Sequence, residues 1–457
     1  MLKRNVAYRL PGGMTSRALA NAICEMLERH KYQALLVGGC VRDLLLGRDP
    51  ADYDVATDAT PVEVAGLFPE SVAVGAQFGV ILIPKNGLKV EVATFRSDVG
   101  YSDGRHPDRV VYSQTPQEDV ERRDFTINGL LMRHDTGEVL DFVGGQKDLH
   151  AGLVRAIGDP DRRFAEDKLR MMRAVRFAAR FGFAIEETTL GSMRRHVSEI
   201  QQVSPERLRE ELTKMLTEGA ARRAFELLEE TGLLGQVLPE IRAMKGVEQP
   251  PEFHPEGDVW IHTCLMLEKL EKGASPTLAW GVLLHDVGKP PTFQSAAETG
   301  DRIRFNHHVD VGVRMAEEIC RRLRFSNDEI GQIAALVANH MRFGHVGSMR
   351  KATLKRFVRL PNFDEHLELH RLDCLSSHGQ LDSYRFVERF LDDTPPEQVR
   401  PPRLLTGDDL LAMGYRPGPR FAQILRGVED AQLEGQIRTE EEAKEYVLRN
   451  FGAGETR

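Results

Sequence analysis

The chain has few cysteines and no long apolar run, and both absences limit what it can be. Its 457 residues include five cysteines, widely separated and without a CxxC pair, so no disulfide framework is expected. No apolar segment approaches the roughly 18 residues that span a bilayer, and the first thirty residues lack the apolar core of a secretion signal. Basic charge is not in surplus either, because the formal net charge is -8. We therefore expect a cytoplasmic protein without a membrane anchor, in which any nucleic-acid binding is confined to local basic faces.

The length and the pattern of elements predict several domains, because 457 residues are too many for one hydrophobic core. Helix and strand patterns alternate at first and then give way to helical periodicity alone. The stretch "KGVEQPPEFHPEGD" (245–258) has the composition of a linker or an ordered surface loop, and "DDTPPEQVRPPR" closes a histidine-rich helical segment. We predict four parts with the bounds 1–150, 151–245, 246–392 and 393–457, the last a helical tail.

The segment "LLVGGCVRDLLLGRDPADYDVAT" (35–57) predicts a strand, a turn at two glycines and a helix. Such a turn, made by Gly38 and Gly39, puts bare backbone N–H groups and a positive helix end where an anion can approach. Arg42 follows on the helix. For two adjacent glycines alone, a tight turn that requires a positive φ is the ordinary alternative.

Two carboxylates follow where the next strand is predicted. Residues two apart on a strand point to the same face, so Asp52 and Asp54 would lie side by side with Tyr53 turned away. Adjacent carboxylates repel unless a cation lies between them, and oxygen ligands combined with substrate phosphates suit Mg²⁺. Glu91, in "KVEVATFR", could add a third carboxylate from a neighbouring strand, as in two-metal sites, or could be an ordinary exposed strand residue.

Four motifs together resemble one known family. They are "LLVGGCVRDLLLG", the "DYD" after it, "ERRDFTINGLL" (121–131) and "EDKLRMMRAVRFAARFGF" (166–183). In this order, over about the first 240 residues, they resemble the class II CCA tRNA nucleotidyltransferases and bacterial poly(A) polymerases. The resemblance implies an α+β chain, in which a head of the polymerase β type nucleotidyltransferase fold precedes a largely all-α neck, body and C-terminal part.

The resemblance also implies roles at the matching positions. The two acidic residues of the DxD would be catalytic and would hold Mg²⁺, together with the less certain third carboxylate: Asp52, Asp54 and Glu91. The glycine turn and two arginines would contact the nucleotide: Gly38, Gly39, Arg42 and Arg123. In the motif EDxxR, Asp167 and Arg170 would read the edge of the incoming base, and Arg173 and Arg176 would line the same pocket.

Periodicity supports the base-reading helix independently. At about 100° per residue, Arg170, Arg173, Arg176 and Arg180 fall on one side of a helix whose other side is apolar. A solvated basic face is the usual meaning of such a pattern. An Asp and an Arg one turn apart, Asp167 and Arg170, can also offer an acceptor and donors together, which would distinguish C from A by the edges of the bases. Protein side chains would then replace a template.

RNA binding is predicted for the segment that follows the head. Residues 150–225 hold 15 Lys and Arg against 11 Asp and Glu, although the whole chain is acidic. This local surplus lies where the resemblance places the neck and the tRNA-binding region, so salt-sensitive phosphate contacts are expected there. The tail (403–457) is expected to contact tRNA as well.

Two segments favour CCA addition over poly(A) addition. Bacterial poly(A) polymerases tend to carry a basic pair after the DxD, where this sequence has Ala76 and Gln77. The segment "RSDVGYSDGRHPD" (96–108) resembles the flexible loop of full CCA-adding enzymes. We therefore predict template-independent addition of C, C and A to the tRNA 3′ end from CTP and ATP. Poly(A) addition, or addition of CC or A alone in a split pathway, are the alternatives.

A second constellation surrounds "LLHDVGKP" (283–290), where a capped helix end could by itself explain the adjacent His and Asp. Histidines and an aspartate elsewhere complete a set that resembles the HD phosphohydrolase superfamily: His262, His285, Asp286, His308, His340 and Asp373, with His307 as an alternative to His308. Mixed imidazole and carboxylate ligands suit a divalent transition metal better than Mg²⁺, and two such ions could clamp a phosphate and activate water. The implied activity is a phosphodiesterase or phosphatase, since similar domains in the family hydrolyse 2′,3′-cyclic phosphates. The alternative is an RNA-binding body that only retains its ligands.

Two other classes of protein are disfavoured by the same motifs. A metal phosphohydrolase with a vestigial head would not need the intact DxD at Asp52 and Asp54. A regulatory RNA-binding protein without chemistry would need neither of the two apparent metal sites. The sequence therefore predicts a nucleotidyltransferase with a second domain that is either hydrolytic or an RNA-binding body.

Overall fold

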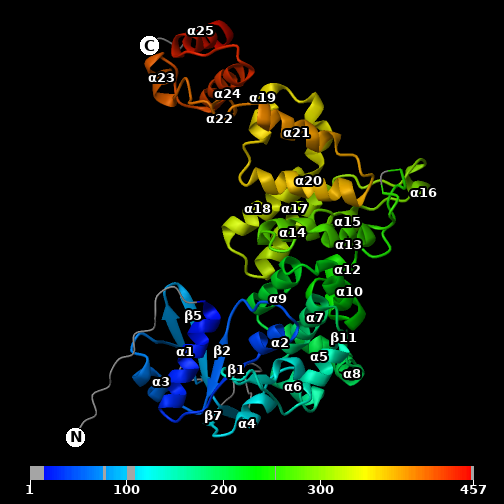
Figure 1. The fold of residues 1–457 in the computed structure, drawn as a ribbon. Coiled ribbons are helices and arrows are strands. Elements are labelled where there is room, and N and C mark those ends of the chain that lie inside the picture. The colour runs from blue at the N-terminus through cyan, green and yellow to red at the C-terminus, as the bar shows by residue number, and fades with distance from the viewer. Residues whose placement is uncertain (1–14, 76–78, 100–108, 253, 454–457) are drawn as a thin grey trace. The chain divides into compact units, whose positions relative to one another are not determined.

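A computed structural model describes residues 15–75, 79–99, 109–252 and 254–453, and these form two compact units that divide between Arg242 and Ala243 (Figure 1). The first unit contains a mixed sheet followed by helices, and the second is built of helices, which confirms the predicted α+β class. The division into four domains stays a prediction. The structure contains no described helix with the length and apolar character needed to cross a membrane.

A seven-stranded sheet is the centre of the head. Its strand order is β3-β4-β5-β2-β1-β8-β9, in which β2 and β5 run parallel and all other neighbours run antiparallel. The strands are β1 (Ala34–Val37), β2 (Asp54–Thr57), β3 (Val72–Gly75), β4 (Val80–Lys85), β5 (Leu88–Thr94), β8 (Leu130–Met132) and β9 (Val139–Asp141). A separate antiparallel pair joins β6 (Arg96–Val99) to β7 (Arg109–Tyr112).

Local sequence explains these elements. The four residues of β1 are all apolar and all buried, whereas β5 alternates, with Val90 and Val92 buried and Glu91 exposed between them. The helix α1 buries one apolar side against β1, β2 and β5. The helices of the head are α1 (Ser16–Arg29), α2 (Gly39–Leu45), α3 (Pro61–Leu67), α4 (Pro116–Glu121), η2 (Thr126–Asn128) and α5 (Gly145–Ala151).

Helices follow the head within the first unit, as predicted, with two short strands among them. The helix α7 packs against both α9 and α10, and its apolar side is buried. The helices are α6 (Pro160–Glu166), α7 (Leu169–Phe181), α8 (Glu187–His196), η3 (Val197–Gln202), α9 (Pro205–Thr217), α10 (Ala221–Thr231), α11 (Leu233–Val237) and α12 (Pro239–Arg242). The strands β10 (Leu153–Val154) and β11 (Ala184–Ile185) pair in parallel, which the weak strand signal of this segment did not predict.

The second unit begins with packed helices around α14, which is apolar on every side and buried. Its helices are α13 (Val259–Lys269), α14 (Pro276–Leu284), α15 (Lys289–Thr292), α16 (Ala296–Thr299), α17 (His308–Arg322), α18 (Asn327–Asn339), η4 (His340–Ser348), α19 (Lys351–Phe357), α20 (Phe363–Ser376), α21 (Asp382–Asp393) and α22 (Pro396–Val399). The tail helices α23 (Gly407–Ala412), α24 (Pro419–Glu434) and α25 (Glu440–Phe451) enclose a core of their own, which includes Leu410, Ile424 and Val447. All five cysteines of the chain are buried, and none of them forms a disulfide bond.

Candidate functional site

A cavity of about 700 Å³ in the first unit gathers most of the residues predicted for nucleotide chemistry. Its lining includes Gly38, Gly39, Arg42, Asp52, Asp54, Arg123, Asp167, Arg170, Arg173 and Arg176. These residues come from segments up to 138 positions apart in the sequence, from Gly38 to Arg176, yet they line one space. Glu91 does not line this cavity but lies beside it on β5, as described below.

The glycine turn between β1 and α2 forms one wall of the cavity. Gly38 has φ of +76°, and a Cβ atom added there would lie 3.3 Å from Nη1 of Arg123. Arg42, one turn into α2, is buried and donates from Nε to Asp43 at 2.9 Å. The turn therefore meets the ordinary backbone requirement for glycine at Gly38 and also brings backbone and guanidinium groups to the cavity, while anion binding by the turn stays a prediction.

The carboxylates lie at the start of β2. The strand begins at Asp54, and Asp52 precedes it as an exposed residue, while Tyr53 between them is buried. Asp54 is paired in register with Glu91 on the parallel strand β5, so these two side chains leave the sheet on the same face. Burial and, after it, the negative charge of Glu91 raise the pKa of Asp54 to about 6. The charges of Glu91 and Asp52 therefore act on Asp54, and a cation beside these carboxylates would relieve their repulsion.

The arginines of α7 face the cavity and are held there by carboxylates. Arg170 pairs with Glu166 at 2.9 Å, and Arg176 pairs with Glu211 at 2.6 Å. Arg170 and Arg176 are only 9% and 6% exposed, so the solvated basic face that periodicity alone suggests is wrong. Arg173, which is partly exposed, pairs with Asp124 at 2.7 Å. These guanidinium groups are therefore fixed in the cavity wall by carboxylates and are not freely solvated.

Asp167 lies between α6 and α7, and a residue that sequence reasoning missed holds it. Arg207 on α9 donates to both oxygens of the Asp167 carboxylate, at 3.1 and 2.8 Å. Other missed lining residues are Arg122, Asp124, Asn128 and Lys214. Arg207, Glu211 and Lys214 recur at spacings of four and three on α9, so a shared polar helix face was the available signal.

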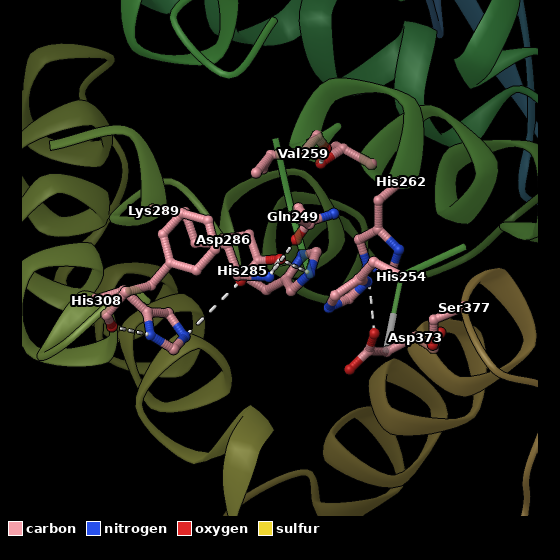
Figure 2. A network of polar contacts seen from close by, with 12 residues as sticks. Gln249, His254, Val259, His262, His285, Asp286, Lys289, His308, Asp373 and Ser377 are labelled. Atoms are coloured by element: carbon pink, nitrogen blue, oxygen red, sulfur yellow. Dashed lines mark hydrogen bonds and ion pairs between the residues drawn. The ribbon is translucent and has the colours of Figure 1, made fainter. Parts of the chain in front are cut away.

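The histidines of the second unit form a second cluster, as predicted from their spacing. Figure 2 shows His262 from α13, His285 and Asp286 after α14, His308 from α17 and Asp373 from α20 directed toward one another. His340 begins η4, and its Nε2 lies 3.7 Å from Oδ1 of Asp286. The Nε2 of His308 lies 3.9 Å from the same oxygen, and the Nε2 of His262 lies 3.2 Å from Oδ1 of Asp373. All six predicted residues therefore meet in one place.

A hydrogen bond at Nδ1, the ring nitrogen opposite Nε2, orients each imidazole. The Nδ1 atoms of His285, His308 and His340 lie 2.9, 2.9 and 2.7 Å from the backbone oxygens of Val282, Phe305 and Val337. The Nδ1 of His262 lies 2.7 Å from Oε1 of Glu256. When Nδ1–H of His285, His308 or His340 donates to such an oxygen, Nε2 is left with a free lone pair, which is how metal-binding histidines are fixed in proteins. At His262, burial is outweighed by hydrogen bonds to Asp373 and Glu256, which raise the pKa to about 9.

The buried atoms without hydrogen-bond partners test whether a metal fits. Oδ1 of Asp286 and Nε2 of His308 and His340 are buried and have no hydrogen-bond partner, and together they could hold one ion. Burial lowers the pKa of His340 to about 4, so its imidazole is neutral and able to coordinate. Two nitrogens and one oxygen are a ligand set typical of transition metals, and the residues present fit such an ion. His307 points away, with 82% of its side chain exposed, so His308 is the better candidate ligand.

Sequence reasoning missed several residues of this second site. Glu256 accepts a hydrogen bond from Nδ1 of His254 at 2.9 Å as well as the bond to His262. Lys289 places Nζ 2.7 Å from Oδ2 of Asp286 and 2.6 Å from Oε1 of Gln249. The stretch that composition described as a linker or an ordered surface loop therefore contributes three of these residues. A cavity of about 550 Å³ opens beside the cluster, lined in part by His254, Lys289, Arg302, Arg304, His308 and Asp373.

Two segments used in the sequence analysis fall on residues outside the described ranges. Ala76 and Gln77, the positions at which poly(A) polymerases tend to be basic, are among them, and so are residues 100–108 of the predicted loop. At these positions the preference for CCA addition over poly(A) addition therefore rests on the sequence alone.

Three family models match consecutive parts of the chain. The "Poly A polymerase head domain" matches residues 34–155, the "Probable RNA and SrmB- binding site of polymerase A" matches 182–245, and the "HD domain" matches 258–368. These ranges contain the glycine turn and the DxD, the helix α9, and five of the six predicted residues of the histidine cluster, respectively, since Asp373 lies beyond the last range.

Proteins of one kind resemble the chain over its whole length. A CCA-adding enzyme of Geobacillus sp. (strain WCH70) is 30% identical over 445 residues, which cover 95% of this chain and 98% of that one. A CCA-adding enzyme of Levilactobacillus brevis is 31% identical over 426 residues, covering 93% and 96%. The crystal structure of the Bacillus stearothermophilus CCA-adding enzyme in complex with CTP has a TM-score of 0.74 and 25% identity, covering 96% and 98%. The resemblance expected from the motifs is thus confirmed, and the chain belongs to the family of CCA-adding enzymes, with a poly(A) polymerase head domain and an HD domain.

Proposed function

We propose that this chain adds C, C and A to the 3′ end of tRNA, using CTP and ATP without a nucleic-acid template. The observation that carries the proposal is one cavity in which the DxD carboxylates and the base-reading pair are lining residues. CCA-adding enzymes as relatives support the same reaction, and a CCA-adding enzyme of Thermotoga maritima with a similar fold forms a complex with tRNA. The reaction joins the RNA 3′ hydroxyl to the nucleotide α-phosphate, with pyrophosphate leaving.

Asp52 and Asp54 would hold Mg²⁺, with Glu91 as the third carboxylate beside them. When bound, Mg²⁺ would help to activate the 3′ hydroxyl and neutralise the charge of the triphosphate. Arg42 and Arg123 line the same cavity and would bind the triphosphate or the sugar, while the glycine turn lets the backbone approach the anion. The raised pKa of Asp54 supports this assignment, since a crowded carboxylate gains most from a cation.

Base selection is assigned to Asp167 and Arg170. A carboxylate accepts from the exocyclic amino group that both C and A carry, and a guanidinium donates to ring nitrogen or carbonyl acceptors. Arg173 and Arg176 line the same wall and would surround the base. Uracil and guanine present a carbonyl where C and A present the amino group, so Asp167 would disfavour them.

Each of the four predicted parts would have its own role in the reaction. Residues 1–150 would carry the chemistry, 151–245 would hold the RNA through their basic surplus, 246–392 would form the HD domain, and 393–457 would add tRNA contacts. Contacts with phosphates would make binding weaken as salt rises.

A second activity is proposed for the HD domain on the strength of its unpartnered ligand atoms. One divalent transition metal held by Asp286, His308 and His340, and a second held by His262, His285 and Asp286 with Asp373 beside them, would polarise a phosphate and activate water for its hydrolysis. The adjoining cavity, with Lys289, Arg302 and Arg304 in its wall, suits an anionic substrate. Hydrolysis of a 2′,3′-cyclic phosphate would open the ring to a phosphomonoester, and a second hydrolysis that releases inorganic phosphate would leave the unblocked 3′ hydroxyl that nucleotide addition requires.

The main proposal is tested with tRNA that ends at the discriminator base. This tRNA is incubated with purified protein and Mg²⁺, CTP and ATP are supplied singly or together, and the tRNA 3′ ends are sequenced. Growth by CCA that then stops is expected, and Asp52→Ala should remove nearly all of it without unfolding the protein, because Asp52 is exposed. A long A tail, addition of CC alone, or near wild-type incorporation by Asp52→Ala would each contradict the proposal.

A further inference from the structure

The residue proposed to read the base is itself fixed by a side chain from another helix. Asp167 lies at the junction of α6 and α7 with extended backbone angles, φ of -150° and ψ of 105°. Its Oδ1 accepts from the backbone N–H of Leu169 at 3.1 Å, and both of its oxygens accept from the guanidinium of Arg207. The side chains of Asp167 and Arg207 are 15% and 18% exposed, and both residues line the nucleotide cavity.

The geometry of this pair fixes the plane of the carboxylate. An Arg fork that donates one hydrogen bond to each carboxylate oxygen holds both groups in one plane, which a single hydrogen bond does not. A carboxylate has about four acceptor positions, so the fork and the Leu169 N–H leave at least one for a base. Without Arg207, the Asp167 side chain would be held by one backbone hydrogen bond and could rotate.

We infer that Arg207 is a positioning residue for nucleotide selection, which holds Asp167 so that a free carboxylate position faces the amino group of C or A. The inference rests on the proposed function of Asp167. Arg207 acts through Asp167 and is not a catalytic residue. Selection of C over U, and of A over G, is then set jointly by α7, which follows Asp167, and by α9.

A second contact along α9 supports the inference. Glu211, one turn after Arg207, accepts from Nε of Arg176 at 2.6 Å, and Arg176 lines the same cavity. The helix α9 thus fixes one acidic and one basic group of the nucleotide wall from behind. Asp167 and Arg207 both line the cavity, which an ion pair that only packed two helices together would not require.

The test separates selection from stability. Single-turnover kcat/KM is measured for CTP and UTP on tRNA ending at the discriminator base, and for ATP and GTP on tRNA ending in CC. Arg207→Gln should lower the CTP:UTP and ATP:GTP ratios by roughly tenfold or more, because Asp167 loses its fixed orientation. Arg207→Lys, which keeps the charge but not the fork, should restore part of the ratio.

Arg195→Gln is the matched control. Arg195 also donates two hydrogen bonds to one aspartate, Asp161, at 2.7 and 2.9 Å, and also joins two helices of the same unit, but neither residue lines the cavity. This variant should keep both nucleotide ratios. Thermal unfolding of all variants shows whether Arg207→Gln is folded, and if it is not, the comparison is made with Arg207→Lys.

A double variant gives a further criterion. Asp167→Ala combined with Arg207→Gln should be no less selective than Asp167→Ala alone, since Arg207 acts only through Asp167. The inference is overturned if Arg207→Gln slows all four nucleotides equally, or if the two substitutions have additive effects on the ratios. Failure of the wild-type protein to incorporate CTP would instead overturn the proposed function itself.

Discussion

Asp54 on β2 and Glu91 on β5 are direct partners in the parallel strand pair of the head, so two carboxylates separated by 37 positions in sequence share one face of the sheet. Glu91 is the largest cause, after burial, of the raised pKa of Asp54. The alternation that suggested Glu91 as a third carboxylate therefore placed it on the correct strand and face. Its part in the reaction stays a prediction.

Glu91→Gln should reduce nucleotide addition while preserving the fold. The substitution removes one negative charge and keeps the shape of the side chain, so the affinity for Mg²⁺ and kcat should fall, kcat on the order of tenfold or more. Rates are measured against Mg²⁺ concentration, with Glu138→Gln, an exposed residue of the same head, as the control. A Glu91→Gln protein with wild-type kcat and Mg²⁺ dependence would show that Glu91 is an ordinary strand residue.

Asp167→Ala should lower the selectivity among the four nucleotides more than it lowers the rate of addition. Removing the acceptor lets U and G compete with C and A, and the C over U ratio should fall about tenfold or more. Single-turnover incorporation of each of the four nucleotides measures this ratio. Selectivity equal to that of the wild type would refute the base-reading role.

Two adjacent histidines, His307 and His308, provide a test variant and a control variant for metal binding at the HD site. His308→Ala removes a nitrogen that faces Asp286, whereas His307→Ala removes a side chain that is 82% exposed. Affinity for a transition metal, measured by titration calorimetry with Mn²⁺, Co²⁺, Ni²⁺ and Zn²⁺, should fall about 100-fold in the first variant and stay unchanged in the second.

Hydrolysis of a 2′,3′-cyclic phosphate should follow the metal in these variants, and treatment with a chelator should remove it from the wild type. CCA addition should be the same in both variants when Mg²⁺ is supplied. Equal metal affinity of the two variants would refute the assignment of His308 as a ligand.

Acid should destabilise the second unit through His366. This side chain is 1% exposed, both ring nitrogens lack hydrogen-bond partners, and burial lowers its pKa from 6.5 to about 4. The stability that the neutral imidazole contributes is complete above pH 6.5 and is lost as the pH falls toward 4. In this range His366 binds a proton in the unfolded chain but not in the folded one. Between pH 7 and pH 5 the loss should be about 2 kcal/mol.

His366→Leu should remove this part of the pH dependence. Both tryptophans, Trp260 and Trp280, belong to the second unit, so urea unfolding followed by their fluorescence reports on it. His345→Leu, a substitution at an exposed position, should leave the pH dependence as it is in the wild type. If His366→Leu loses as much stability on acidification as the wild type, the histidine is not the cause.

Local patterns were sufficient to predict the elements and residues that depend on near neighbours. The pair Asp52 and Asp54, the glycine turn and the helix bearing Arg170 follow from spacing within a few residues. The carboxylates that hold the arginines could not be predicted in this way. Asp124 and Glu211 come from other segments, and nothing in the sequence near Arg173 or Arg176 indicates which acid will pair with each.

The second site shows a different limit of composition. Prolines and glycines made residues 245–258 look like a linker or an ordered surface loop, and the structure favours the second, because Glu256 orients His262 and Gln249 contacts Lys289. A loop can be held in place by a few polar bonds to a buried cluster, and composition does not reveal those bonds. The histidine spacing, in contrast, was informative because each ligand lies at or beside the end of a recognisable helix.

The register of Asp54 against Glu91 has a consequence for how the head can change its length in evolution. Successive residues of a strand face opposite ways, so one residue inserted within β5 before Glu91 would turn that carboxylate to the far side of the sheet. An insertion at the turn of Asn86 and Gly87, which joins β4 to β5 with positive φ at both residues, would leave the strand pairing intact. Variation in length among related heads should therefore collect in such turns, while the distance along the strand from the turn to the acid stays constant.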